Sequence, residues 1–107
     1  MKTRDMQVIA KGFSALAWGD YSFFTNKQTG ETLPREEART KMEDWFINSW
    51  NDDDYNYINR ENIKFNYDRI GKWVTIKGTA KTGAKFEIRI TAPDMITMNG
   101  IKINFNP

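Results

Sequence analysis

One short segment of the chain concentrates side chains that could bind a cation or a charged partner. It contains three aspartates and two tyrosines, namely Asp52, Asp53, Asp54, Tyr55 and Tyr57. An EF-hand loop beginning at Asp52 would need a glycine at its sixth position and a glutamate at its twelfth. The chain has Tyr57 and Ile63 at these positions, so the segment does not match an EF-hand.

The acidic segment allows three interpretations. It can be the exit of a helix, where Asp and Asn supply turn hydrogen bonds. It can be an acidic and aromatic recognition loop, because tyrosine offers amphipathic contact area and carboxylates attract a basic partner. A carboxylate pair for metal-assisted chemistry would need further ligands at a fixed spacing, and none follows. We therefore predict no metal site and no cofactor.

The composition removes most kinds of catalysis. The chain has no cysteine and no histidine, so it lacks a thiolate nucleophile, the usual general base and the commonest transition-metal ligand. None of the patterns GxGxxG, GxxxxGK[ST], GxSxG or HExxH occurs. We expect a protein that is not an enzyme, although a mechanism based on Asp, Glu, Lys or Tyr stays open.

The chain length indicates one domain over residues 1–107. The net charge is +2, but residues 1–59 carry −3 and residues 60–107 carry +5. This asymmetry predicts a molecule with an acidic and a basic side. No long apolar run and no apolar leader is present, so we expect a cytoplasmic protein that does not contact membranes.

Two segments have the apolar spacing of amphipathic helices. Residues 34–50 are the clearer case, with Pro34 suited to the first turn and an apolar stripe that includes Trp45 and Trp50. We interpret both tryptophans as core. Residues 4–17 form a possible N-terminal helix, in which Gly12 is unfavourable by about 1 kcal/mol relative to alanine.

From residue 62 onward the apolar period changes to two, which is typical of strands. Four or five strands follow, and the last two flank Asn99-Gly100, the preferred dipeptide of a tight hairpin. A two-residue turn at this position pairs Ile96 with Ile103. The predicted fold class is α+β, with the helix at 34–50 packed on an antiparallel meander. By the order of its elements alone, this arrangement resembles cystatin-like and NTF2-like shapes.

The strand alternation also places a set of basic residues on the face that points away from the helix. This set comprises Lys64, Trp73, Lys77, Lys85 and Arg89. Cations along phosphates and a ring for base stacking are the minimum equipment for single-stranded nucleic acid. A solvated face of a one-sided sheet shows the same alternation, so both interpretations stay open.

Residues 20–25 read as a short strand with aromatic rings on both sides, including Tyr21 and Phe23. We predict that this segment and the acidic segment contact a partner protein with a basic surface, as an inhibitor or adaptor would. Nucleic-acid binding on the basic sheet face is the alternative, and a small-ligand pocket between helix and sheet is a third possibility. We expect the strand at residues 101–105 to lie at an edge of the sheet, which would allow a homodimer.

Overall fold

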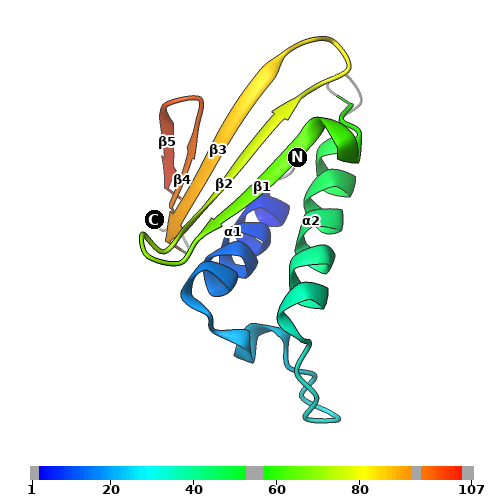
Figure 1. Cartoon of the computed structure of the whole chain (residues 1–107), viewed down its shortest axis with the longest axis vertical. Coiled ribbons are helices and arrows are strands. Elements are labelled where there is room, and N and C mark those ends of the chain that lie inside the picture. Colours follow the sequence, from blue (N-terminus) through cyan, green and yellow to red (C-terminus); the bar gives the residue numbers. More distant parts are fainter. Residues whose placement is uncertain (1–2, 53–56, 93–94, 105–107) are drawn as a thin grey trace.

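The computed structural model describes residues 3–52, 57–92 and 95–104. Its elements are α1 (Thr3–Trp18), η1 (Tyr21–Phe24), α2 (Arg35–Asn51), η2 (Arg60–Asn62), β1 (Ile63–Asp68), β2 (Trp73–Thr79), β3 (Lys85–Ala92), β4 (Met95–Met98) and β5 (Ile101–Asn104). The strands form one antiparallel sheet in the order β1-β2-β3-β4-β5. Both helices cover the same face of this sheet (Figure 1). The predicted α+β fold class is therefore confirmed.

The two helices begin and end within one residue of their predicted bounds. Pro34 is the N-cap of α2, and Glu36 and Glu37 lie in its first turn, where the helix dipole favours anions. The N-terminal helix, predicted as an addition to the main one, lies at the centre of the core. The fully buried Phe13 of α1 stacks on Phe65 of β1, with 5.7 Å between the ring centroids.

Gly12 has a packing role that compensates for its low helix propensity. A Cβ atom at this position would lie 2.5 Å from the Sδ and Cε atoms of Met42 in α2. A larger side chain at residue 12 would therefore have to push the Met42 side chain away. The close contact between α1 and α2 depends on this glycine.

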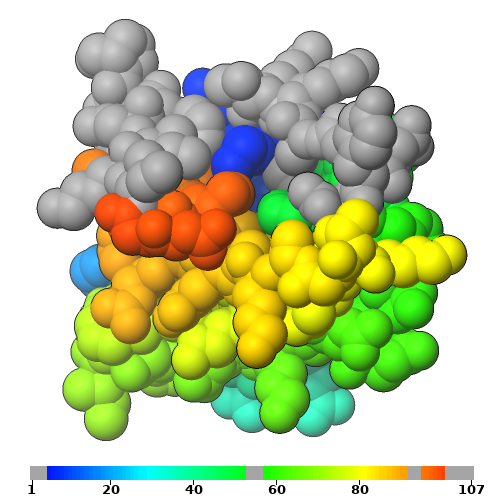
Figure 2. Space-filling view, turned by 90° about the horizontal axis from the view of Figure 1, so that it is seen from above, coloured from blue at the N-terminus to red at the C-terminus, as the bar shows by residue number. Residues whose placement is uncertain are grey.

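The sheet has the register that the alternation predicts. Asn99 and Gly100 both have positive φ, 50° and 84°, as a type I′ turn requires. Ile96 consequently faces Ile103 across the last hairpin. Figure 2 shows the β2–β3 hairpin, in yellow, between the green start of β1 and the orange-red β4–β5 hairpin. The inward row of β2 and β3 is buried and includes Val74, Ile76, Ile88 and Ile90.

The prediction of a strand at residues 20–25 is wrong. Tyr21–Phe24 form the 3-10 helix η1, because the Asp20 carboxylate accepts hydrogen bonds from the Ser22 backbone (3.0 Å) and from Ser22 Oγ (2.6 Å). These hydrogen bonds, that of the Ser22 hydroxyl first, hold the pKa of Asp20 below its usual range. A local side-chain bond to the backbone thus competes successfully with extended structure.

One polar cluster joins α2 to the start of the sheet. The Tyr67 hydroxyl of β1 donates a 2.6 Å hydrogen bond to Glu43, whose other oxygen accepts a 2.6 Å bond from Arg60. The Arg39 guanidinium lies 4.1 Å from the centroid of the Tyr67 ring. Burial, followed by the Glu43 hydrogen bond, raises the pKa of Tyr67 far above its usual value. This cluster fixes α2 against β1.

Candidate functional site

The first aspartate of the acidic segment ends α2. Asp52 is the C-cap, and its N–H donates to the Asn48 carbonyl at 3.2 Å. The Asn51 side chain closes the following loop, since its amide donates to the Ile58 carbonyl (3.0 Å) and accepts from the Ile58 N–H (2.9 Å). Tyr57, near the end of the loop, is 46% exposed. Asp53, Asp54 and Tyr55 lie outside the described residues.

The structure does not join the acidic segment to the second predicted contact, Tyr21 and Phe23. η1 lies at the other end of α2, where the Leu33 N–H donates to the Phe24 carbonyl at 3.2 Å. A helix of 17 residues separates the two segments, which corresponds to about 25 Å. Tyr21 is half-buried with its hydroxyl enclosed, whereas Phe23 is 42% exposed. The described members of the predicted protein-binding set, Asp52 and Tyr57 on one side and Tyr21 and Phe23 on the other, therefore lie at two separate places.

Phe23 instead contributes to a hollow between η1 and the first half of α2. This hollow has a volume of about 510 Å³, and its apolar lining comes from Phe23, Phe24, Leu33, Met42 and Trp45. Glu31 and Glu37 also line it, and both are exposed. We call these seven residues the acidic groove. Trp45 was predicted to belong to the core, and it packs against the core while it also lines this groove.

The acidic character continues along the solvent side of α2. A second, shallow hollow shares Glu37 and Trp45 with the acidic groove and adds Glu36 and Asp44. Among the residues that line the two hollows, Lys41 is the one cation against four carboxylates, of which Asp44 is already paired with Arg60 at 3.0 Å. Such a surface attracts positively charged groups, while the exposed ring of Phe23 and the half-buried ring of Trp45 offer apolar contact.

The residues predicted for nucleic acid lie together on the outer face of the sheet. We call them the basic face, and they are Lys64, Trp73, Lys77, Lys85 and Arg89. Lys64 and Lys77 are direct partners on β1 and β2. The four cations are exposed, and they alternate with buried residues of the same strands. This part of the predicted site is thus one continuous surface.

Two features of the basic face oppose the binding of nucleic acid. The Glu87 carboxylate lies 4.0 Å from the Lys77 ammonium and reduces the local positive charge. The Trp73 ring is half-buried, with the Arg89 guanidinium 4.9 Å from its centroid. A Cβ at Gly71 would lie 2.1 Å from this ring, so the backbone of the turn is also in close contact with it. A base would have to displace Arg89 to stack on Trp73.

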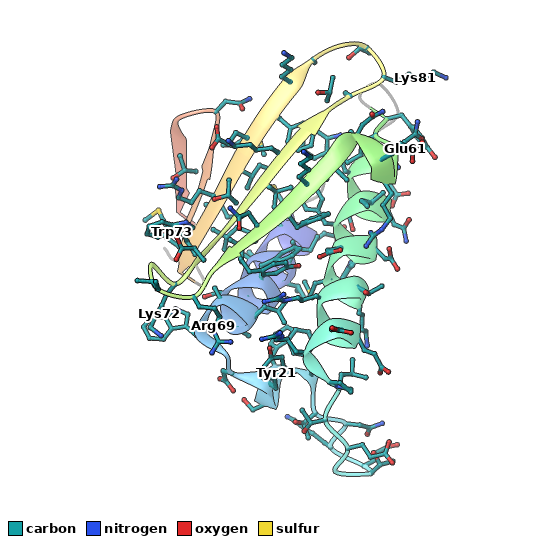
Figure 3. All side chains as sticks on the ribbon, in the orientation of Figure 1. Tyr21, Glu61, Arg69, Lys72, Trp73 and Lys81 are labelled. Atoms are coloured by element: carbon teal, nitrogen blue, oxygen red, sulfur yellow. The ribbon has the colours of Figure 1, made fainter. Side chains whose placement is uncertain are left out.

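The sequence analysis missed a group of residues at the turn between β1 and β2. Ile70 is 97% exposed, and Trp18 at the end of α1 is 56% exposed. The Lys72 ammonium lies 4.6 Å from the centroid of the Trp18 ring, and Arg69 lies against Gly19. We call Trp18, Arg69, Ile70 and Lys72 the turn cluster. Figure 3 shows Arg69, Lys72 and Trp73 at one end of the sheet, with Glu61 and Lys81 at the other.

One signal in the sequence could have indicated the turn cluster. Ile70 stands between Asp68 and Gly71, and the Asp68 carboxylate accepts a 2.7 Å hydrogen bond from the Gly71 N–H. An isoleucine enclosed by turn-forming residues is too far from both strands to enter the core. An exposed apolar side chain was therefore to be expected at this position.

A further hollow, of about 710 Å³, lies on the surface between α1 and η1. Its lining includes the rings of Trp18 and Phe23, the hydroxyls of Ser14 and Ser22, and the ammonium group of Lys11. The third prediction placed a small-ligand pocket between helix and sheet. This hollow is bounded mainly by α1 and the segment that follows it, and Thr91 of β3 is its one lining residue from the sheet.

Comparisons with family models, with curated proteins and with solved structures find no match for this chain. The likeness to cystatin-like and NTF2-like shapes therefore stays a prediction. Within the described ranges, no three acidic side chains gather as a possible metal site. In the same part of the chain, neither helix combines the length and hydropathy needed to cross a membrane.

Proposed function

We propose that this chain is a non-enzymatic binding protein that modulates another protein, and that the acidic groove takes up a basic, partly apolar segment of that partner. The observation that carries this proposal is the exposure of Phe23, 42% of whose surface is open beside Trp45 and Leu33. Aromatic rings that line a hollow gain contact area when a partner covers them. Clusters of this kind are enriched in protein interfaces.

The two components of the groove have different roles in binding. Burial of apolar surface supplies most of the favourable free energy, and the loss of translational and rotational freedom offsets part of it. The carboxylates of Glu31 and Glu37 select a cationic partner and increase the association rate at low salt. The partner is therefore expected to present lysine or arginine next to an apolar side chain, and the complex should weaken as salt increases.

The test compares two exposed aromatic residues at opposite ends of α2. Phe23 and Tyr57 are 42% and 46% exposed, so Phe23→Ser and Tyr57→Ser remove similar surface from the two predicted contacts. The unmodified protein and both variants are immobilised, and the captured proteins are quantified by mass spectrometry. We expect at least one basic protein whose recovery falls about tenfold for Phe23→Ser and stays unchanged for Tyr57→Ser.

Because Phe23 packs edge-on against Phe24 at 5.1 Å, its replacement could also weaken the fold. Glu37→Lys provides a second variant, since this side chain is exposed. The recovery of the same captured protein should fall with both Phe23→Ser and Glu37→Lys. Loss with Tyr57→Ser alone would move the binding site to the loop after α2 and would overturn the assignment to the groove.

Nucleic-acid binding is the second candidate, supported by the continuity of the basic face across β1, β2 and β3. Its test is fluorescence anisotropy with labelled single-stranded and duplex oligonucleotides at about 50 and about 200 mM salt. This candidate would be supported by micromolar binding that weakens steeply with salt. The binding should also be lost in the double variant Lys77→Ala with Arg89→Ala. Absence of binding at the lower salt concentration would exclude it. Either candidate is compatible with the cytoplasmic location that we expect.

A further inference from the structure

The turn cluster is the most exposed apolar feature among the described residues. Ile70 is 97% exposed, although burial of an isoleucine side chain is favourable by about 2 kcal/mol. Because Ile70 is almost fully solvated, it does not enter any groove of its own molecule. An apolar side chain at the tip of a turn, with a half-exposed tryptophan next to it, has the form of a protein contact.

The backbone and the cations hold this turn in one shape. Lys72 has a φ of 61°, in the left-handed region that non-glycine residues seldom adopt. This conformation places the Lys72 ammonium over the Trp18 ring at 4.6 Å. Arg69 is held beside Gly19, at the end of α1, where the helix dipole favours a cation. Ile70 therefore projects from a preorganised turn with a positive charge on each side.

The chemistry of a surface that would accept this turn follows from these residues. It must offer an apolar hollow for Ile70, with carboxylates at the rim for Arg69 and Lys72. The acidic groove has both properties, since Phe23, Leu33 and Trp45 line it and the exposed carboxylates of Glu31 and Glu37 outnumber Lys41, the one cation in the lining of this hollow. Both halves of a complementary contact are thus present in the same chain.

We propose that the turn cluster of one molecule binds in the acidic groove of a second copy of this chain. This inference rests on the proposal that the groove is a protein-binding site, and it names a second copy as an occupant. The two surfaces are different, so the contact is heterologous, and it closes into a ring or continues as an open chain according to the rotation between copies. A partner protein with a similar basic and apolar segment would compete with this self-contact.

The contact is small, and the association should be weak. One turn of four residues in one groove buries much less than the roughly 1,600 Å² of a standard protein interface. A dissociation constant between about 10 µM and about 500 µM corresponds to a few well-placed residues. Sedimentation equilibrium of the purified chain should therefore show a weight-average mass that rises from 12.5 kDa with concentration. The rise should be smaller at high salt.

The decisive experiment mixes two variants that each lack one half of the contact. Ile70→Asp retains the groove and loses the apolar tip, while Glu31→Lys with Glu37→Lys retains the tip and reverses the rim charge. Each variant alone should associate at least tenfold more weakly than the unmodified chain. An equimolar mixture should form a complex with one copy of each, with an affinity within about threefold of the original contact.

Three results would overturn the inference. The unmodified chain could remain a monomer up to about 500 µM, Ile70→Asp could associate as strongly as the original chain, or the mixed variants could fail to combine. Vesicles with phosphatidylserine and labelled oligonucleotides are included as other anionic partners. If Ile70→Asp abolishes binding to one of these but leaves the sedimentation unchanged, the turn serves that partner. Self-association is measured on pure protein, so its failure leaves the capture experiment on the groove unaffected.

Discussion

The acidic groove and the basic face belong to opposite layers of one domain, and they differ in what surrounds their charges. In the groove, the carboxylates of Glu31 and Glu37 stand beside the exposed Phe23 ring and the half-buried side chains of Leu33 and Trp45. On the basic face, the one large ring, Trp73, is covered by Arg89 and by the backbone at Gly71. Charge alone is normal for a solvated surface. Exposed apolar area next to charge better indicates a site for a partner.

The same comparison explains the charge asymmetry of the sequence. The acidic first part supplies η1 and α2, and the basic second part supplies the sheet. Because the meander exposes only one face to solvent, its lysines must gather there. The carboxylates of α2 gather on its outer side because the inner side packs on the core. The two layers are linked through Glu43, which contacts both Arg60 and Tyr67.

The largest expected effect is a reversal of charge in the groove. Glu31→Lys with Glu37→Lys should weaken the complex with a basic protein partner by about tenfold per charge, because attraction becomes repulsion. Titration calorimetry at low salt measures this change. The matched control, Lys64→Glu with Lys77→Glu, reverses two charges on the basic face. Its affinity for the same partner should stay within about twofold of that of the unmodified chain. Equal losses in both variants would mean that both layers contact the partner.

The packing between the two layers is expected to show the next largest effect. A Cβ at Gly78 would lie 2.3 Å from the Phe86 ring, and Phe86 stacks on Trp50 of α2 at 4.3 Å. Gly78→Val should therefore lower the free energy of unfolding by about 2 kcal/mol in urea titrations. Lys77→Val introduces the same side chain at the neighbouring exposed position. This variant should change the free energy of unfolding by less than about 0.5 kcal/mol. Similar values for both variants would contradict this packing.

A smaller effect should appear at alkaline pH through the cluster that joins the layers. The pKa of Tyr67 is raised in the folded state above its ordinary value of 10.0. Its contribution to stability is thus fully present below about pH 10 and declines as the pH rises further, with a slope of about 1.4 kcal/mol per pH unit. Tyr67→Phe should remove this decline. Urea titrations at about pH 8 and pH 11 measure it.

Tyr57→Phe is the control for this measurement, because Tyr57 is exposed and does not belong to the cluster of Tyr67 and Glu43. It should retain the alkaline decline of the unmodified chain. At pH 8, Tyr67→Phe is expected to cost about 1 kcal/mol for the lost hydrogen bond to Glu43. An unchanged alkaline decline in Tyr67→Phe would mean that the Tyr67 hydroxyl is not enclosed as described.

The smallest effect is expected for the ion pair on the basic face. Lys77 and Glu87 are both exposed and 4.0 Å apart, so Glu87→Gln should alter the free energy of unfolding by less than about 0.5 kcal/mol. The variant nevertheless makes the face more positive. If oligonucleotides bind there, their affinity should rise at low salt. An unchanged or lower affinity would argue that the face is a solvated surface.

Most of the fold was predictable from the sequence, because the dominant signals were periodic. The bounds of both helices and the pairing of Ile96 with Ile103 agree with the structure. The exception is η1, in which aromatic residues occupy both odd and even positions and so show no alternation. Hydrogen bonds from Ser22 to the Asp20 carboxylate decide its conformation. Periodicity carries no information about a competition of this kind.

The candidate site was less predictable. The basic face follows directly from strand alternation, so its five residues could be named in advance. The acidic groove combines Glu31, Leu33 and Trp45 with Phe23, and these residues meet only because η1 and the following loop pack on the first half of α2. No spacing in the sequence indicates that these residues lie together.

The sequence by itself determined the fold class, the strand register, the division of charge and the absence of cysteine and histidine chemistry. These properties depend on local periodicity and on residue types. The tertiary structure decided which side chains share a surface. It separated Phe23 from Asp52 by the length of α2, placed Arg89 over Trp73, and left Ile70 in solvent. Such outcomes depend on how elements pack in three dimensions, where contacts form between residues that are far apart in the chain.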